Sequence, residues 1–180
     1  GLNFAVIGFF EPLISFSGNY TQADFNTMLF IAKLATLIGY LFTGTLSEKL
    51  GRKPVMCIYV VLWTVSIIAV VIGSNMTEGG FVLVSIGASF ASIATAGCNV
   101  LTYLIIYEII PTEARATSSG VKLVVGTLGT SMGLLIISLL TVPLSAGGAL
   151  ITLALIFLIN LPLFYFFLKE TKGVDLTKIH

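Results

Sequence analysis

The feature that most constrains this chain is a succession of long apolar runs separated by short joints. The runs cover about 1–20, 24–47, 54–74, 80–107, 115–141 and 147–168. Each run is close to the roughly 20 residues that cross a bilayer as a helix. The runs lack the alternation of strands, and lipid tolerates strands only in closed barrels. We therefore predict an all-α membrane protein with six transmembrane helices over 1–168 and a tail over 169–180.

The small number of charged residues supports a membrane location. Charged residues make up 9% of the 180 and apolar residues 57%, whereas roughly 25% of a typical soluble domain is charged. So few charges do not cover a water-facing surface, and lipid must solvate much of the chain. The net charge of +1 gives no basic footprint, which argues against binding to nucleic acid.

The sequence shows no residue set that would carry catalysis or bind a metal. Cys57 and Cys98 lie inside apolar runs without metal-ligand spacing, and His180 is the last residue. We interpret the cysteines as small buried hydrophobic residues. Because no nucleophile–base pair or phosphate-cradling loop is evident, we predict neither an enzyme nor a requirement for a cofactor or metal.

Basic residues gather in alternate joints, which predicts the orientation. Seven of the nine lysines and arginines follow the second, fourth and sixth runs: Lys49, Arg52, Lys53, Arg115, Lys169, Lys172 and Lys178. The positive-inside rule places these joints and the C-terminus in the cytoplasm. We expect a multi-pass protein of the plasma membrane. Because Gly1 lies within an apolar run, we also expect the chain to be a piece of a longer protein.

Polar or small side chains recur at helical spacing on three of the runs. They are Lys33, Thr36, Tyr40, Thr43 and Ser47 on the second, Ser85, Ser89, Ser92, Asn99 and Thr102 on the fourth, and Lys122, Gly126, Gly129 and Gly133 on the fifth. Such faces either pack helices together, as small residues do in membranes, or surround a water-filled cavity. Three such faces together with buried charges favour the cavity.

Three ionisable residues lie well inside the predicted helices: Glu11, Lys33 and Lys122. A charge near mid-bilayer costs at least a few kcal/mol, so these residues should face a cavity or a partner. Pro12 should kink the first helix beside Glu11. Glu11 could exchange protons, pair with Lys33 or contact a substrate. Lys122 could instead extend toward the cytoplasmic interface.

Three motifs carry a family resemblance. Residues 44–53 read Gly-Thr-Leu-Ser-Glu-Lys-Leu-Gly-Arg-Lys, which resembles the G-x-L-x-D-R-x-G-R-R loop of the major facilitator superfamily. Residues 108–115 read Glu-Ile-Ile-Pro-Thr-Glu-Ala-Arg and resemble the E-x-x-P-T-x-x-R motif of its sugar-porter and related metabolite branches. Residues 170–173 resemble the end of the P-E-T-K-G motif. In this order, the motifs resemble the C-terminal six-helix half of a twelve-helix transporter.

The resemblance implies a fold and a function. In that fold the first, second, fourth and fifth helices of a half line the cavity or the domain interface, and the third and sixth face lipid. The implied function is secondary active transport of a small polar or charged metabolite by alternating access, coupled to protons. The implied partners are a solute, protons, the lipid bilayer, and a missing N-terminal half or a second copy of the chain. The candidate substrate-binding or coupling residues are Glu11, Lys33, Asn99, Tyr103 and Lys122.

The resemblance also implies a cytoplasmic gate. Its candidate residues are Gly44, Glu48, Gly51, Arg52, Glu108 and Arg115. The glycines would allow close helix approach and a tight turn, and the opposite charges would join the cytoplasmic helix ends. The alternative is a static surface network, in which each exposed pair contributes about 0–1 kcal/mol.

The substrate stays open, because the chain departs from glucose-type sugar porters. The first run lacks their Q-Q-x-x-G-x-N pattern, and residues 97–103 lack both prolines of their G-P-x-P-W segment. Sugars, organic acids, amino-acid-like solutes and organic cations are all candidates. An alternative function is that of a non-transporting membrane solute sensor or a partner subunit derived from a transporter half.

Overall fold

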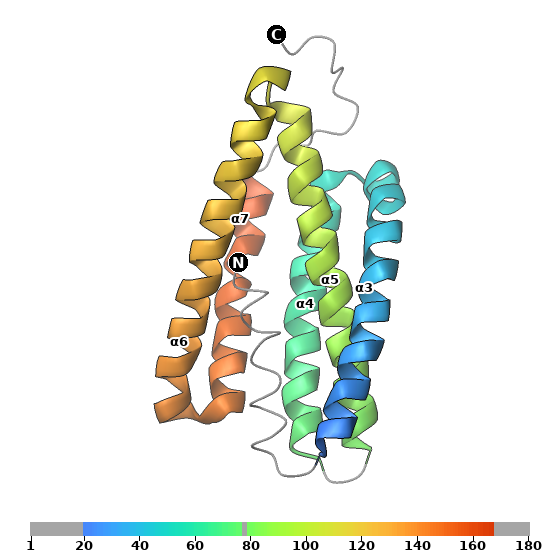
Figure 1. Ribbon diagram of the computed structural model, residues 1–180, viewed down its shortest axis with the longest axis vertical. Helices are drawn as coiled ribbons and strands as arrows, with labels where there is room; N and C mark the ends of the chain where they lie inside the picture. The colour runs from blue at the N-terminus through green and yellow to red at the C-terminus, as the bar shows by residue number, and fades with distance from the viewer. Residues whose placement is uncertain (1–19, 77–78, 168–180) are drawn as a thin grey trace.

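The chain folds into a bundle of helices. The computed structural model describes residues 20–76 and 79–167, and these contain helices and no strand. The elements are α3 (Gln22–Leu50), α4 (Arg52–Ser74), α5 (Gly80–Ile109), the short 3₁₀ helix η1 (Thr112–Ala114), α6 (Arg115–Phe157) and α7 (Asn160–Phe167), as Figure 1 shows. The predicted all-helical fold is therefore confirmed over the described residues.

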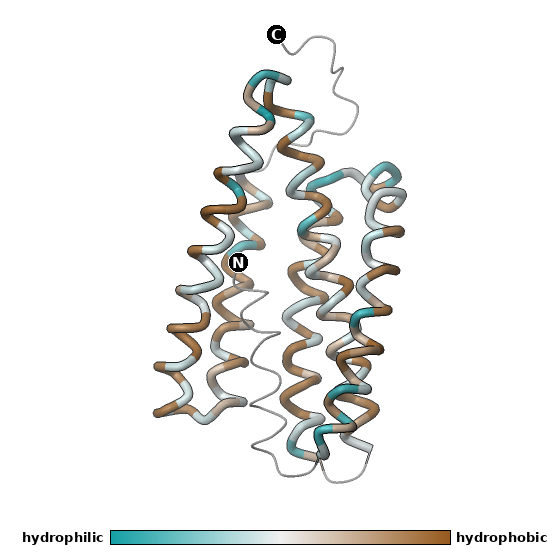
Figure 2. Tube along the Cα trace, viewed as in Figure 1, coloured by the Kyte–Doolittle hydropathy of each residue, from teal (hydrophilic) through white to brown (hydrophobic). Residues whose placement is uncertain are grey.

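Four helical segments are long and apolar enough to cross a membrane. They are α3, α4, α5 and the stretch Thr112–Phe166. Figure 2 shows hydrophobic residues along the middles of the helices and hydrophilic residues mainly near their ends. The predicted first helix, at about 1–20, and the predicted tail, at 169–180, lie outside the described residues. The count of six transmembrane helices thus stays a prediction.

The turn between α3 and α4 depends on a glycine. At Gly51 φ is 100°, a region that favours glycine because other residues place their Cβ too close to the backbone there. Helix α4 begins directly afterwards, and Pro54 is tolerated in its first turn, where no intrahelical donor is needed. This turn and the α5–α6 junction lie at the same end of the bundle (Figure 1).

Helix α6 folds back on itself. A straight helix of 43 residues would be about 65 Å long, twice the roughly 30 Å of a bilayer's hydrocarbon core. Pro143 removes a backbone donor inside the helix, and Ser145 leaves helical geometry with φ 63° and ψ 168°. Two arms, 115–144 and 146–157, result, as can be followed in Figure 1. The break lies between the runs at 115–141 and 147–168, where the sequence predicts two separate helices.

The helix predicted at 147–168 is not continuous over its described residues. A turn at 158–159 separates the second arm of α6 from α7. The physical reason is Pro162, which has no N–H to donate and would clash with the carbonyl of Leu158 in a regular helix. The Asn160 side chain supplies a local replacement, since its Nδ2 donates to the Phe157 carbonyl over 2.8 Å.

The core lies where α3, α4 and α5 meet. Trp63 of α4 is fully buried, and its ring centroid lies 4.5 Å from that of Phe157. A Cβ added at Gly39 of α3 would lie 2.9 Å from the Ile93 carbonyl oxygen of α5, so these two backbones are in contact. The outer side of α4 is apolar and exposed at Ile58, Val61, Val65 and Ile72. Helix α4 therefore serves the core as well as an outer face.

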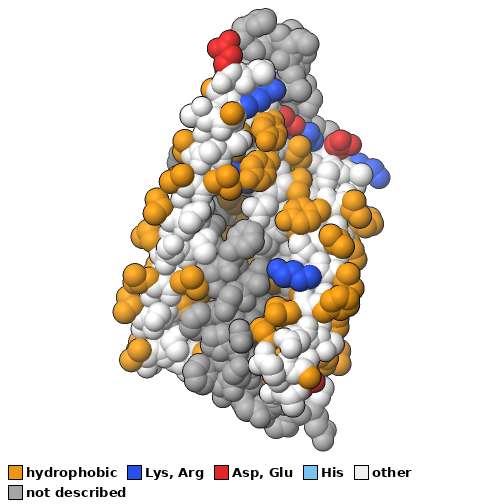
Figure 3. Space-filling view, in the orientation of Figure 1, with side chains coloured by type: hydrophobic (Ala, Val, Ile, Leu, Met, Phe, Trp, Pro, Cys, Tyr) orange, Lys and Arg blue, Asp and Glu red, His pale blue; other side chains and the backbone are white. Residues whose placement is uncertain are grey.

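The first arm of α6 packs much less closely. Between Arg115 and Leu144, Gly133 and Ile137 are buried, and most of the large hydrophobic side chains are exposed. In Figure 3, hydrophobic side chains are spread along this arm, and charged side chains gather mainly toward the end of the bundle that carries the α5–α6 junction. Space is left between this arm and α5.

Candidate functional site

A cavity of about 800 Å³ lies between α5, the first arm of α6, α4 and α7. This volume is within the roughly 300–1,000 Å³ of typical small-molecule sites. Apolar side chains of Met56, Phe157 and Phe164 form part of its lining. Its polar lining includes Asn99, Thr102, Tyr103, Lys122, Thr130 and Asn160.

The cavity brings together three of the predicted site residues. Asn99 and Tyr103 are four residues apart on α5, so they share one face of the helix, and Lys122 enters from α6. The Lys122 Nζ lies 2.9 Å from the centroid of the Tyr103 ring, where a cation is attracted by the electron-rich ring face. The same Nζ is buried and has no hydrogen-bond partner among the described residues.

The sequence reasoning missed further polar groups of the lining, including Thr130 and Asn160. The Thr130 hydroxyl donates to the Gly126 carbonyl over 3.0 Å, and a hydroxyl that donates can still accept. Thr130 lies four residues beyond Gly126, so the small-residue face of the fifth run could have pointed to it. Asn160 is the main polar side chain of the last apolar run, but the resemblance implied that this helix faces lipid.

Lys33 does not join this cavity. Its side chain is exposed on α3 and makes no hydrogen bond or ion pair within the described part of the chain. The polar stripe predicted on this helix is divided, because Thr43 and Ser47 are buried. The Thr43 hydroxyl lies 2.8 Å from that of Tyr59 in a buried contact between α3 and α4. Glu11, the predicted partner of Lys33, lies outside the described residues.

At the end of the bundle near the cavity, Arg52 and Glu108 form an ion pair. Arg52 Nη2 lies 2.6 Å and Nε 3.0 Å from Glu108 Oε1, while Arg52 Nη1 donates to the Ser47 carbonyl over 2.9 Å. The two side chains are only 12% and 14% exposed. Such charge-assisted bonds are stronger than neutral ones. Arg52 thus joins the end of α3, the start of α4 and the end of α5.

The other predicted gate residues are arranged differently from the expectation. Glu48 is exposed and has no ion pair within 20–76 and 79–167. Arg115 Nε donates to the Ile110 carbonyl over 3.1 Å, which closes the corner around Pro111. A Cβ at Gly44 would have nothing within 4 Å among the described residues, so no described helix approaches Gly44 closely, and its role in the gate stays a prediction. Gly39 makes that contact instead.

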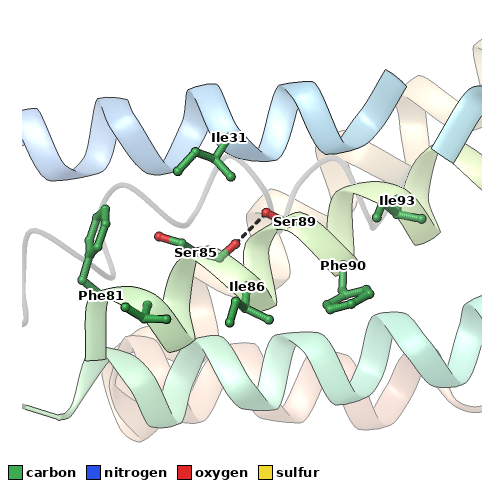
Figure 4. A pocket seen from close by; sticks show the side chains of 8 residues that line it. Ile31, Phe81, Ser85, Ile86, Ser89, Phe90 and Ile93 are labelled. Atoms are coloured by element: carbon green, nitrogen blue, oxygen red, sulfur yellow. Dashed lines mark hydrogen bonds between the residues drawn. The ribbon is translucent and has the colours of Figure 1, made fainter. Parts of the chain in front are cut away.

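A second hollow, of about 370 Å³, lies between α3 and α5. Figure 4 shows Ile31 of α3 opposite Ser85 and Ser89 of α5. The polar residues predicted along α5 are therefore divided: Ser85 and Ser89 line this groove, and Asn99 and Thr102 line the cavity. The Ser89 hydroxyl donates to the Ser85 carbonyl over 2.7 Å. None of the described residues that line the groove is charged, so it suits a charged solute less well than the cavity does.

Lys122 stands between the cavity and the charged end of the bundle. A further space of about 440 Å³ lies between the end of α5 and the start of α6, and Lys122 and Val125 line both spaces. Along α5, Tyr103 is five residues from Glu108, which is about 7.5 Å. Along α5, the Arg52–Glu108 ion pair and the cavity are thus about one and a half helical turns apart.

Comparison with known proteins gives a consistent result. The family model described as Major Facilitator Superfamily matches residues 1–179. The chain is 32% identical over 133 residues to "Inner membrane transport protein YnfM" of Escherichia coli K12, an alignment that covers 72% of this chain and 30% of that protein. It is 26% identical over 137 residues to the "Putative metabolite transport protein" of Haemophilus influenzae, with 76% and 32% covered.

A plant protein is also similar. The "Probable inorganic phosphate transporter 1-6" of Arabidopsis thaliana is 28% identical over 154 residues, which cover 83% of this chain and 29% of that protein. The chain thus spans about a third of the length of these relatives. No solved structure gives a significant match. The family match over nearly the whole chain and the four apolar helices identify a multi-pass integral membrane protein that belongs to the Major Facilitator Superfamily.

Proposed function

We propose that this chain is the C-terminal, six-helix half of a secondary active transporter that moves a small polar or charged metabolite by alternating access. The order of the three motifs supports this proposal, as does the span of about a third of each relative. Transport by superfamily members needs two halves around a shared path, so the remainder of a longer protein or a second copy would complete it. The clustered basic joints support a cytoplasmic C-terminus in the plasma membrane.

The cavity beside Lys122 is the observation that carries the proposal. Polar and charged groups within a bilayer are costly, and they usually line a solute path. Here Asn99, Tyr103 and Lys122 converge from two helices on one space, although much of the exposed surface of α6 is apolar. That arrangement suits a solute with polar groups better than a purely structural contact between helices.

The ion pair between Arg52 and Glu108 is the main contact of the proposed cytoplasmic gate. Because the pair ties three helix ends together, those ends move as one body when the halves rock. Alternating access requires inward-open and outward-open states of similar free energy, so a small bias at this end changes their populations. Arg115, through its hydrogen bond to the Ile110 carbonyl, holds the α5–α6 corner in place next to the Arg52–Glu108 ion pair.

Uptake by the full-length parent protein tests this function. Proteoliposomes would be given labelled sugars, organic acids and amines with and without a pH gradient. We expect saturable uptake of one class, reduced at least about ten-fold by Asn99→Leu, which removes a polar lining group. Val65→Ala, on the outer face of α4, is the matched control and should leave uptake unchanged. Saturable binding with no uptake would favour the solute sensor instead.

Two variants separate the gate from the coupling. Arg115→Ala should slow uptake while the protein stays in the membrane and still binds the solute, and unchanged uptake would refute the gate.

Glu11 is the proposed proton-exchanging group. Glu11→Gln should abolish uptake driven by a pH gradient yet spare exchange of labelled for unlabelled solute, and intact gradient-driven uptake would contradict the coupling role.

A further inference from the structure

We infer that the cavity selects an anionic solute, whose carboxylate or phosphate group binds the Lys122 ammonium. The inference rests on the proposed function, in that it takes this cavity as the place where solute is bound. It narrows the substrate to one class among the sugars, acids and amines that the sequence leaves open.

The charge of the lining is the first argument. Lys122 is the one charged residue among those that line the cavity within the described part of the chain, and no Asp or Glu is among them. With one positive charge and no acidic side chain among its described lining residues, the cavity attracts anions and repels cations. The other polar groups, such as Asn99 and Thr130, are neutral. They can bind the uncharged part of a polar solute and do not discriminate between an anion and a cation.

The unmet hydrogen-bonding capacity of Lys122 is the second argument. An ammonium has three N–H donors, yet Nζ has no hydrogen-bond partner within the described residues and almost no contact with solvent. The face of the Tyr103 ring, 2.9 Å away at its centroid, offers electrostatic attraction but no lone pair. An anionic oxygen would supply the acceptor that the ring lacks and would form a charge-assisted hydrogen bond.

The position of the ammonium argues against a lysine that extends toward the membrane interface. A lysine that extends toward the interface leaves its ammonium in water, whereas this Nζ is buried beside Tyr103. Lys33, the other intramembrane lysine of the described residues, does have an exposed side chain. Lys122 also lines the second space toward the charged end of the bundle, so an anion passing between the two spaces would meet it.

Ligand-dependent thermal stability provides the test. The full-length parent protein in nanodiscs of neutral phosphatidylcholine would be heated with inorganic phosphate, succinate, glucose or choline at equal ionic strength, with chloride as the background anion. We expect phosphate or succinate, and neither neutral nor cationic probe, to raise the Tm. Comparison of the two anions shows whether phosphate or carboxylate is preferred.

Variants assign the effect to Lys122. Lys122→Gln should weaken anion binding at least about ten-fold, and Lys122→Arg should retain part of it. Val65→Ala, on the outer face of α4, is the control and should respond like wild type. An undiminished response in Lys122→Gln would overturn the inference. If Lys122→Gln does not fold, the wild-type protein alone still tests the inference. A wild-type protein that is stabilised by glucose or choline, and by neither phosphate nor succinate, would overturn the anion site.

Uptake assays of the same preparation distinguish this inference from the proposed function. Uptake of glucose or choline without uptake or binding of either anion would leave the transporter standing and contradict the anion site. Anion stabilisation that depends on Lys122, with no uptake of any solute, would support the anion site and contradict transport. Anion uptake that is lost in Lys122→Gln and retained in Val65→Ala would support both.

Discussion

The two sides of α5 are packed in opposite ways. On one side α5 meets α4 so closely that a Cβ at Gly97 would overlap the ring of Tyr59. On the other side it faces the first arm of α6 across a cavity of about 800 Å³, and a Cβ at Gly126 of that arm would have nothing within 4 Å. Glycine thus allows contact at one interface and leaves open space at the other.

This difference shows what separates the scaffold from the solute site. Small residues let helices approach closely in membranes, and whether they do so here differs between the two sides of α5. Gly97 lies opposite an aromatic ring that fills the interface, whereas Gly126 lies one turn after Lys122, whose ammonium cannot be packed against apolar side chains without cost. The neighbours of a glycine therefore decide which role it has.

The largest effect should come from the centre of the packed side. Trp63→Ala removes a fully buried ring that packs on Phe157, and we expect a loss of about 3–5 kcal/mol in the free energy of unfolding. Reversible unfolding in mixed detergent micelles measures this loss. Val65→Ala, at an exposed position on the same helix, should lose far less. Equal losses at the two positions would contradict the proposed core.

The next effect concerns the ion pair that ties the packed helices together. Arg52→Gln leaves the mostly buried Glu108 carboxylate without its guanidinium, and we expect a loss of about 3 kcal/mol in unfolding free energy. In a double-mutant cycle, addition of Glu108→Gln should recover part of that loss, because it removes the carboxylate charge that the Arg52 guanidinium had balanced. Strictly additive losses would show that the two side chains do not act as a pair.

A smaller effect compares two glycines of α3. Gly39→Ala would place a Cβ 2.9 Å from the Ile93 carbonyl oxygen, and we expect the forced separation of α3 and α5 to cost about 1–3 kcal/mol. Gly44→Ala enters open space and should be neutral or stabilising by up to about 1 kcal/mol, since alanine favours helix. Unfolding of both variants under the same conditions measures the contrast. The opposite order would place the close helix contact at Gly44.

Much of the helical framework could be predicted from the sequence, because long apolar runs and breakers act locally. The runs at 24–47, 54–74 and 80–107 correspond to α3, α4 and α5, and Pro143 marked the fold-back of α6. The turn at 158–159 was missed, although Pro162 explains it, because the apolar run hid a local break. Its consequence, an amide from α7 in the cavity, depends on the tertiary fold.

The site was predictable only in part, for a physical reason. Lys33 and Lys122 have similar apolar neighbours in sequence, yet the first is exposed and the second lines the cavity. Which way each side chain points depends on how its helix is rotated against the others, and spacing along one helix does not fix that rotation. The same holds for Gly39 and Gly44: among the described residues, Gly39 contacts α5 and Gly44 has no neighbour within 4 Å of an added Cβ.

Access of water to the cavity tests the central claim most directly. In a background with Cys57→Ala and Cys98→Ala, Thr127→Cys would place a thiol in the cavity lining, and Val65→Cys would place one on the outer face of α4. Both would be treated with a charged, water-soluble methanethiosulfonate in the full-length protein, with and without solute and a pH gradient. We predict that Thr127→Cys is modified and is protected by solute, while Val65→Cys stays unreacted. A Thr127→Cys thiol that remains sealed under every condition would contradict a solute-binding cavity between α5 and α6.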